Sequence, residues 1–456
     1  MKYESLTDQI FAAGVVGCGG AGFPTHAKYK GAFDTILLNG AECEPLLRTD
    51  RYLMRHRAEE IVTAAGALMK ETGAARCVIA LKENYREEIA SLTAAIRRLS
   101  SPVELHRMGS FYPAGDEQTL VCEVTGRVVP PAGIPLDVGC VVSNVATVNA
   151  VFDAMEGKPF LYKYLTVTGE VAHPVILKVP VGTPVSRCLE LAGGPLCGGD
   201  YLVINGGPMM GIPMAREKAL ASYVTKTTSG LIVLPEDSFL ARHSGISLEH
   251  MANRARSSCI QCSHCTELCP RYLLGHPLQP HKIMRKMAMS TDFAAMLEDP
   301  DIQGAALCCQ CGICELYACP MGLQPRRVNG ILKGLLSRAG VRYPKSGETF
   351  SPREGREERK APTRRAASRA GVLRYYDYTI DDLIEDAPSR VSLSLRQHIG
   401  APSEPVVSPG DRVSAGQLVA RCPEGKLGAN LHASIGGVVT AVQDAIVIEA
   451  QEGDAK

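Results

Sequence analysis

The most informative segment of this sequence is Cys259-Ile260-Gln261-Cys262-Ser263-His264-Cys265-Thr266-Glu267-Leu268-Cys269-Pro270. A second run repeats the pattern with one extra residue before its last cysteine, and it reads Cys308-Cys309-Gln310-Cys311-Gly312-Ile313-Cys314-Glu315-Leu316-Tyr317-Ala318-Cys319-Pro320. In each run three closely spaced cysteines bring their thiols into one tight loop, whose amide groups can point at sulfur. Each run therefore predicts a loop that wraps around one side of a compact inorganic cluster.

The spacing C-x2-C-x2-C-x3-C-P belongs to proteins with two iron–sulfur clusters, in which the fourth cysteine ligates the other cluster. We therefore expect two [4Fe–4S] clusters with crossed ligation. One cluster takes Cys259, Cys262, Cys265 and Cys319, and the other takes Cys308, Cys311, Cys314 and Cys269. Cys309 is left over and is expected to be a packing residue. A protein with such clusters moves single electrons.

Zinc and disulfide bonds are the alternatives for these cysteines. Zinc sites favour pairs of C-x2-4-C separated by a finger-length loop rather than four cysteines in one run closed by proline. A disulfide framework suits a short secreted chain, whereas this sequence has 456 residues and shows no signal peptide. The spacing thus favours iron–sulfur clusters over both.

Bulk properties narrow the class of protein. The length predicts about three domains. A net charge of +1 gives no electrostatic footprint for nucleic acid, and no apolar run has the ~18 residues that a membrane span requires. The 17 cysteines without an export signal indicate the reducing cytoplasm, where thiolates are free to bind metal.

Near the N-terminus, residues 5–14 are predicted as a short helix that leads into a glycine-rich loop. Gly17, Gly19 and Gly22 match the dinucleotide fingerprint G-x-G-x-x-G, but no strand precedes them and Pro24 follows closely, which argues against a Rossmann site. The plain alternative is a glycine-rich turn. The many unobstructed N–H groups, with Lys28 nearby, favour a nest that binds a phosphate.

Helical and strand patterns alternate after this loop. Strands are predicted at 35–39, 77–82 and 103–107, and helices at 55–70 and 85–99, which indicates an α/β domain. Polar loops follow at 39–45, 112–117 and 143–147, and ligands of open α/β sheets bind at such strand ends. Taken singly, each loop is ordinary turn chemistry.

The remaining chain changes texture several times. We expect an α/β domain over 1–160, a domain with strand patterns over 161–245 and a helical ferredoxin-like domain with two [4Fe–4S] clusters over 246–340. A charged run at 353–360 marks a solvated, weakly ordered linker over 341–370. A small β domain closes the chain over 371–456.

Together, the glycine-rich loop and the three polar loops resemble the flavin-binding domain of the complex I 51-kDa subunit and of the RnfC protein of the Rnf complex. The family loop G-x-G-G-A-G-F-P-T-x-x-K is matched from Gly17 to Lys28, and the segment N-G-x-E-x-E-P from Asn39 to Pro45. The resemblance implies an FMN site, with NADH stacked on the flavin. By position, FMN would contact Gly17, Gly19, Lys28, Asn39, Glu42, Tyr112, Gly115, Asp116, Glu117, Asn144 and Thr147, and NADH would contact Gly20, Phe23 and Glu44.

The sequence departs from the 51-kDa pattern at two of these positions. Cys18 stands where that protein has arginine, and Asp116 where it has glutamate. Loss of the arginine removes a cation from the pyridine-nucleotide site. Glu42, Glu44 and Glu117 gathered in one pocket would favour a neutral or cationic ring over a second anion.

The later domains extend the resemblance. Residues 165–213 resemble the soluble-ligand-binding β-grasp (SLBB) domain of the same family, and 406–441 resemble a biotinyl/lipoyl-type barrel-sandwich hybrid. Lys426 lacks the flanking residues of a biotin- or lipoate-carrying lysine, which argues against a swinging arm. In RnfC the hybrid domain precedes the glycine-rich loop, whereas here it follows the cysteines.

This domain order, together with the run from Cys308 to Met321, is similar to the cobalamin reductases of propanediol-utilisation microcompartments. The resemblance implies an NADH-dependent oxidoreductase with FMN and two [4Fe–4S] clusters and with a corrinoid, cobalamin, as acceptor. It also implies a cobalamin adenosyltransferase and a microcompartment shell protein as partners. Two alternatives stay open: an Rnf-like electron-transfer protein that serves ferredoxin or a partner protein, and a scaffold whose clusters relay electrons without an NADH site.

Overall fold

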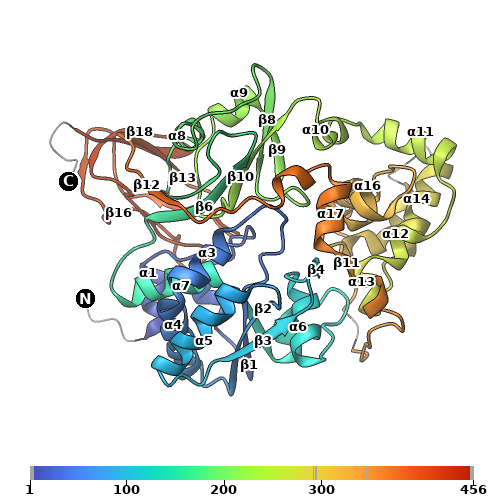
Figure 1. Ribbon diagram of the computed structural model, residues 1–456, viewed down its shortest axis with the longest axis horizontal. Coiled ribbons are helices and arrows are strands. Elements are labelled where there is room, and N and C mark those ends of the chain that lie inside the picture. Colours follow the sequence, from blue (N-terminus) through green and yellow to red (C-terminus); the bar gives the residue numbers. More distant parts are fainter. Residues whose placement is uncertain (1–4, 291, 293–294, 346, 452–456) are drawn as a thin grey trace.

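The computed structural model describes residues 5–290, 292, 295–345 and 347–451. An α/β unit, a β-grasp unit, a helical unit and a β-sandwich lie around a common centre (Figure 1). Segment 361–385 runs along this centre and contributes strands to two of the units. No helix of the described residues is long and apolar enough to cross a bilayer.

The α/β unit is built on a parallel sheet in the order β3-β2-β1-β5. Its strands are β1 (Thr35–Asn39), β2 (Arg76–Lys82), β3 (Glu104–Met108) and β5 (Cys140–Asn144). Ile36 and Leu38 pack into the core shared with the helices of one face, whereas Leu37 packs with Leu120 of α6 on the other face. Burial on both faces explains why these strands are continuous apolar runs.

Helices cover this sheet as the alternating pattern predicts. They are α1 (Leu6–Ala12), α3 (Thr49–His56), α4 (Ala58–Thr72), α5 (Arg86–Arg98), α6 (Glu117–Thr125) and α7 (Val145–Met155). The single helix expected over 55–70 is wrong in one respect, because the chain breaks at Arg57 with a φ of −129°. The Arg57 side chain instead hydrogen-bonds Asn149 and Asp153 of α7.

The β-grasp unit has a six-stranded sheet in the order β12-β7-β6-β10-β8-β9. Its strands are β6 (Tyr162–Gly169), β7 (Val175–Pro180), β8 (Tyr201–Asn205), β9 (Ile212–Ala215), β10 (Gly230–Pro235) and β12 (Leu383–Glu385). Helix α8 (Val185–Leu191) packs on this sheet through buried Val185 and Leu189. The edge strand β12 comes from the far end of the chain, so the sheet is completed late in the sequence.

The cysteine runs lie on short helices, as expected. These are α11 (Leu248–Ser258), α12 (His264–Glu267), α13 (Pro270–Leu273), α14 (Pro280–Met289), α15 (Pro300–Gln303) and α16 (Pro325–Arg338). Buried Ile283, Met287, Val328 and Leu332 form their common core. The helices therefore hold the two cysteine loops in a fixed relation to each other.

Segment 347–370 is ordered, contrary to the weakly ordered linker expected from its composition. Half-buried Glu123 of α6 forms ion pairs with Arg356 and Lys360. Strand β11 (Ala361–Pro362) then pairs with β4 (Phe111–Tyr112), and α17 (Thr363–Arg369) follows. The charged residues of this segment, which in the sequence indicate a solvated linker, are paired with a carboxylate that is distant in the chain.

The C-terminal unit has two antiparallel sheets, β13-β19-β18-β15 and β14-β16-β17. The longer strands are β13 (Arg390–Ser394), β16 (Leu418–Arg421), β18 (Gly437–Val442) and β19 (Ala445–Glu449), and the short strands are β14 (Glu404–Pro405), β15 (Arg412–Val413) and β17 (Leu431–His432). This unit packs against the glycine-rich loop, where the Ile399 N–H donates to the Gly22 carbonyl at 3.0 Å. Buried Lys226 bonds the carbonyls of Gly14 and Asn430 and so fastens the same contact.

Candidate functional site: two cysteine loops beside a sheet edge

The first cysteine set surrounds a small buried cavity. Cys269, Cys308, Cys311 and Cys314 all line it, and all four are buried. Burial raises the pKa of the Cys314 thiol well above its ordinary value, and the neighbouring Cys308 and Cys269 thiols add to this increase. We call this set the inner cysteines. The crossed set proposed from the spacing is thus brought together, although Cys309 lines the same cavity.

The second set lies closer to the surface, and we call its members the outer cysteines. Burial raises the pKa of Cys265 to about 12, with the nearby thiols of Cys319, Cys262 and Cys259 adding to the shift. Cys259, Cys262 and Cys265 are only half-buried, and the adjacent Ile260 is 62% exposed. One cysteine set is therefore enclosed by protein, and the other borders solvent.

Both loops have the same backbone conformation. Gln261 and Ser263 in the outer loop have φ values of 54° and 65°, and Gln310 and Gly312 in the inner loop have 60° and 82°. Left-handed conformations at non-glycine residues are costly and persist where the surroundings require them. They turn amide groups toward sulfur, as when the Gln310 N–H donates to Cys308 Sγ at 3.4 Å. This loop geometry, with four thiols around each position, fits a [4Fe–4S] cluster in each set.

The extra residue of the second run produces a π-helical turn. Where the first run forms the α-helical turn α12, the second forms η4 (Ile313–Ala318) with π-type geometry. A π-turn accommodates one inserted residue without ending the helix. Buried Glu315 in this turn pairs with Arg326 at 3.0 Å and accepts the Arg327 N–H. The carboxylate of Glu315, which lies in this π-helical turn, thus links the inner loop to α16.

The predicted flavin residues converge at the carboxyl ends of β1 and β5. Asn39 and Asn144 are direct neighbours in the sheet register. Asn39 Nδ2 donates to the Gly115 carbonyl at 2.8 Å, and a Cβ at Gly19 would contact the Asn144 side chain at 3.4 Å. The chain leaves β1 toward β2 on one side while β5 lies on the other, which is the topological switch point where such sheets bind ligands.

The glycine-rich loop lies over this edge. The Cys18 N–H donates to Thr147 Oγ1 at 2.9 Å, and the Gly17 N–H donates to the Phe23 carbonyl at 2.9 Å. Gly19 and Gly20 are exposed, and a Cβ at Gly20 would meet no atom within 4 Å. The loop therefore presents bare backbone at the sheet edge, which fits a flavin or nucleotide lying against it. Cys18 itself is buried filler, as its position among glycines suggests.

Two further predicted residues pair with each other. Lys28 Nζ contacts Glu117 Oε1 at 2.9 Å, and both side chains keep solvent contact. Glu117 does not line the pocket that Glu42 and Glu44 share. The first turn of α6 places Glu117 beside Lys28, and the expectation that all three carboxylates border one flavin pocket stays a prediction.

Glu42 faces the beginning of α3. Its Oε2 accepts the Asp50 N–H at 2.5 Å and the Arg51 N–H at 3.4 Å, so the carboxyl group satisfies free amides of the first helical turn. Burial is the main cause that raises the pKa of Glu42 to about 8, and the nearby Asp50 adds to it. Asp50 in turn accepts from Asn144 Nδ2 at 2.6 Å. Glu42 is thereby coupled to the flavin edge through α3.

Glu44 and Tyr112 connect the sheet edge to the inner cysteines. Tyr112 Oη donates to the Cys311 carbonyl at 2.7 Å and to Glu44 Oε1 at 3.2 Å. Glu44 Oε2 also accepts the Met209 N–H at 2.8 Å, and burial raises the pKa of Glu44 to about 7. The hydroxyl of a predicted flavin residue thus contacts the backbone of a predicted cluster ligand. Among the described residues, no comparable bridge reaches the outer loop.

Arg271 is a functional residue that the sequence patterns did not reveal. It follows Cys269-Pro270 directly and binds Asp116 with two hydrogen bonds of 2.6 and 2.9 Å. Burial would raise the pKa of Asp116, but Arg271 holds it below its ordinary value. The adjacency of Arg271 to a ligand cysteine was a visible signal. Its partner could not be predicted because Asp116 lies far away in the chain.

Four family models match the chain. Residues 10–153 match the Nuo51 FMN-binding domain, and residues 258–324 match the 4Fe-4S dicluster domain. Residues 164–213 match the SLBB domain, and residues 377–455 match the RnfC barrel sandwich hybrid domain. The four kinds of domain expected from the sequence are confirmed.

Whole-length relatives decide the family. Cobalamin reductase PduS of Salmonella typhimurium is 41% identical over 447 residues, which are 97% of this chain and 96% of the relative. Cobalamin reductase PduS of Citrobacter freundii is 40% identical over 443 residues, covering 97% and 95%. The chain belongs to the PduS family.

More distant relatives share part of the PduS-family architecture. The C subunit of the Na(+)-translocating ferredoxin:NAD(+) oxidoreductase complex of Acetobacterium woodii is 34% identical over 279 residues, which are 60% of this chain and 59% of that relative. The PduS-family chain therefore has FMN and two [4Fe–4S] clusters as its cofactors, with NADH as a donor consistent with its Nuo51-type domain. It is an oxidoreductase that transfers electrons between flavin and iron–sulfur centres.

Proposed function

We propose that this chain is an NADH-dependent cobalamin reductase that reduces cob(III)alamin to cob(II)alamin or cob(I)alamin for adenosylation. The observation that carries the proposal is its likeness, along 97% of its length, to two relatives named cobalamin reductase. The convergence of the predicted flavin residues beside the inner cysteines supports it. When bound, FMN accepts the two electrons of a hydride together and passes them on singly to iron–sulfur clusters.

The chain's own residues would hold the cofactors as follows. The glycine-rich loop, with exposed backbone at Gly19 and Gly20 and with Gly17 beside them, and the amides at the start of α7 would receive FMN at the β1–β5 edge, together with Asn39 and Asn144. Phe23 and Glu44 would contact the nicotinamide side. The eight cysteines of the inner and outer sets would ligate two clusters. Hydride transfer requires no side-chain acid or base, so orientation is the protein's main contribution.

Burial gives the electron path a direction. Tyr112 joins the flavin edge to the inner loop through the Cys311 carbonyl, and the outer loop lies beyond it, toward solvent. The ion pair between Asp116 and Arg271 joins the start of α6 to the residue that follows Cys269-Pro270. We infer a series that runs from the sheet edge to the inner set, then to the outer set, and then to the acceptor.

The acceptor end is the surface around the outer loop. Ile260 is 62% exposed and Met321, next to Pro320, is 38% exposed, so the outer cysteines border a partly apolar surface. We propose that the corrinoid is reduced there, in contact with a cobalamin adenosyltransferase. We also propose that a shell protein retains the enzyme in a bacterial microcompartment. A cysteine introduced at Ile260 should cross-link to the adenosyltransferase if this surface contacts it. The absence of a cross-link would contradict the proposed contact.

The test is anaerobic. Reconstituted protein is mixed with NADH and hydroxocobalamin, and the visible spectrum is followed. We expect the cob(II)alamin spectrum to appear at a rate that requires both FMN and the clusters. Flavin bleaching without corrinoid reduction would instead identify an Rnf-like electron-transfer protein, which is the function that the Acetobacterium woodii relative favours. A flavin that does not bleach with NADH would overturn the proposed NADH contacts.

A further inference from the structure

A second cavity lies behind the Glu42–Glu44 loop. Its volume is about 490 Å³, and it opens over the carboxyl ends of β1 and β2. Glu42, Arg48, Lys82, Tyr85, Thr363 and Tyr376 are among its lining residues. Within the described chain, no residue of the glycine-rich loop lines it. The cavity is therefore distinct from the loop that we assign to the flavin, although Glu42 and Glu44 border both.

Lys82 is a buried cation without an anionic partner. The residue is 2% exposed, and Nζ makes two long hydrogen bonds of 3.4 Å, to the Glu42 carbonyl and to Thr363 Oγ1, and lies 5.7 Å from the centre of the Tyr85 ring. In the parts of the chain that the structure describes, it makes no ion pair. A buried ammonium without a countercharge is strongly destabilising. An anion in the cavity would supply that countercharge.

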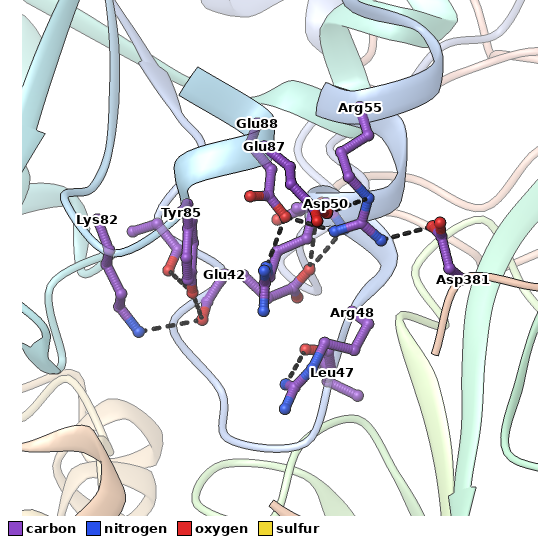
Figure 2. Close-up of polar contacts among 12 residues, drawn as sticks. Glu42, Leu47, Arg48, Asp50, Arg55, Lys82, Tyr85, Glu87, Glu88 and Asp381 are labelled. Atoms are coloured by element: carbon purple, nitrogen blue, oxygen red, sulfur yellow. Dashed lines mark hydrogen bonds and ion pairs between the residues drawn. The ribbon is translucent and has the colours of Figure 1, made fainter. Parts of the chain in front are cut away.

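Arg48 has the same character. Its guanidinium binds only the carbonyls of Leu47 at 2.7 Å and Tyr376 at 2.6 Å, and no carboxylate pairs with it among the described residues. Figure 2 shows Lys82 reaching the Glu42 carbonyl on one side and Arg48 turned to the Leu47 carbonyl on the other. Two cations thus reach this cavity with only uncharged partners, which are backbone carbonyls, a hydroxyl group and the rings of Tyr376 and Tyr85.

The other arginines of the cavity differ from these two, because Arg86 is exposed to solvent and the charges of Arg51 and Arg55 are matched. Arg51 and Arg55 both bind buried Glu88, at 2.7 and 2.5 Å, and Arg55 also binds Asp381 at 2.6 Å (Figure 2). The nearest carboxyl group, Glu42, is directed to the N–H groups of α3 rather than to Lys82. Within the described chain, the unmatched positive charge that is shielded from solvent in this cavity is therefore that of Lys82 and Arg48.

The remaining lining suits a ligand larger than a simple ion. Tyr85 and Tyr376 contribute aromatic rings, and Ser110, Thr363 and Thr379 contribute hydroxyl groups. The volume falls in the range of roughly 300–1,000 Å³ typical of small-molecule sites. We propose that this cavity binds a phosphorylated nucleoside, with its phosphate on Lys82 and Arg48. The source is either a free mononucleotide or the nucleotide tail of the corrinoid acceptor, and only the second rests on the proposed function.

The first experiment measures AMP binding to FMN- and cluster-loaded protein by isothermal titration calorimetry. Lys82→Met and Arg48→Gln should each weaken AMP binding roughly tenfold or more, because each removes a charge-assisted hydrogen bond. Arg76→Gln is the matched control, since Arg76 begins the same strand and makes only an exposed pair with Glu104. Lys82→Met should also raise Tm, because it removes an uncompensated buried charge, so a loss of binding would not reflect misfolding.

The second experiment separates the two sources. If the corrinoid tail is the occupant, Lys82→Met raises KM for cobalamin but not for cobinamide, which lacks the nucleotide, and AMP competes with cobalamin. If a free mononucleotide is the occupant, AMP binding depends on Lys82 while KM for cobalamin does not. The proposal is overturned if neither quantity depends on Lys82, or if Lys82→Met releases FMN or raises KM for NADH. Failure of cobalamin reduction in the unaltered protein would overturn the proposed function but leave the AMP test intact.

Discussion

The inner and outer cysteine loops have left-handed residues at the same two positions, but they differ in the protein packed around them. These residues are Gln261 and Ser263 in the outer loop and Gln310 and Gly312 in the inner loop. Around the outer loop, Ile260 is 62% exposed. Around the inner loop, a Cβ at Gly312 would come within 3.0 Å of the Met209 carbonyl, so the β-grasp unit packs directly on it. Cysteine spacing determines the backbone conformation of each loop, whereas tertiary packing determines which electron donor or acceptor can approach it.

The largest expected difference comes from removing one ligand from each set. Cys314→Ala should reduce NADH-dependent reduction of the corrinoid, and of the outer cluster, to background, since the inner cluster comes first. Cys262→Ala should also abolish corrinoid reduction, but FMN should stay bound and the inner cluster should still be reduced by NADH. Iron content and anaerobic electron paramagnetic resonance measure both. Full acceptor activity in Cys262→Ala would rule out a serial path.

The next difference concerns the residue after each Cys-Pro pair, which is Arg271 for the inner set and Met321 for the outer set. Arg271→Met should lower the free energy of unfolding by about 3–5 kcal/mol, because it leaves Asp116 buried without its partner. Met321→Ala is the matched change and should cost below about 0.5 kcal/mol at this exposed site. Urea titrations compare them, and equal effects would contradict the contrast.

The Arg271 effect should also depend on pH. Asp116 has a pKa below its ordinary value, so its contribution to stability is present above the unfolded pKa of about 4 and is lost as pH falls through the lower folded value. The difference between the unaltered protein and Arg271→Met should therefore be largest near neutral pH and should shrink as the solution becomes acidic, because burial without Arg271 also raises the pKa of Asp116 in the variant. Urea midpoints measured across this range provide the check. A difference that grows on acidification would exclude Asp116 as the cause.

A smaller effect on stability is expected from Glu44, which is linked through Tyr112 to the inner loop. Its pKa is raised to about 7 by burial, so the folded state holds a proton that the unfolded state releases above its ordinary pKa of about 4.5. Stability should fall as pH rises from about 4.5 to about 7, and Glu44→Gln should remove that slope. At pH 8 the variant should be more stable by on the order of 2 kcal/mol. A thermal-unfolding series from pH 5 to pH 8 measures this, and an unchanged slope would be the contrary result.

The smallest effects test the shared backbone itself. Gly312→Ser should destabilise by about 1–2 kcal/mol, because it places a side chain at a left-handed position against the Met209 carbonyl. Ser263→Gly, the reciprocal change in the outer loop, should be neutral or stabilising by less than about 1 kcal/mol. Chemical denaturation of both variants with clusters intact would show this asymmetry. Equal costs would mean that the two loops are equally confined.

Local patterns were sufficient for much of this molecule. The strand predicted at 35–39 has those bounds, and the cysteine spacing predicts which thiols are brought together. The break at Arg57, the partner of Arg271 and the order of segment 347–370 could not be predicted, because each depends on residues distant in the chain: Asp153, Asp116 and Glu123. Which cysteine set is enclosed and which borders solvent likewise depends on tertiary packing, so it could not be predicted from the two similar runs.

The contact between the C-terminal sandwich and the glycine-rich loop has an evolutionary consequence. The sandwich reaches residues 14–22 through non-covalent contacts, including the bonds of Ile399 to Gly22 and of Lys226 to Gly14 and Asn430. A module held in this way can be moved along a gene without changing its place in the folded protein. Domain order then becomes a record of recombination, and relatives with shuffled genes can be compared surface by surface instead of residue by residue.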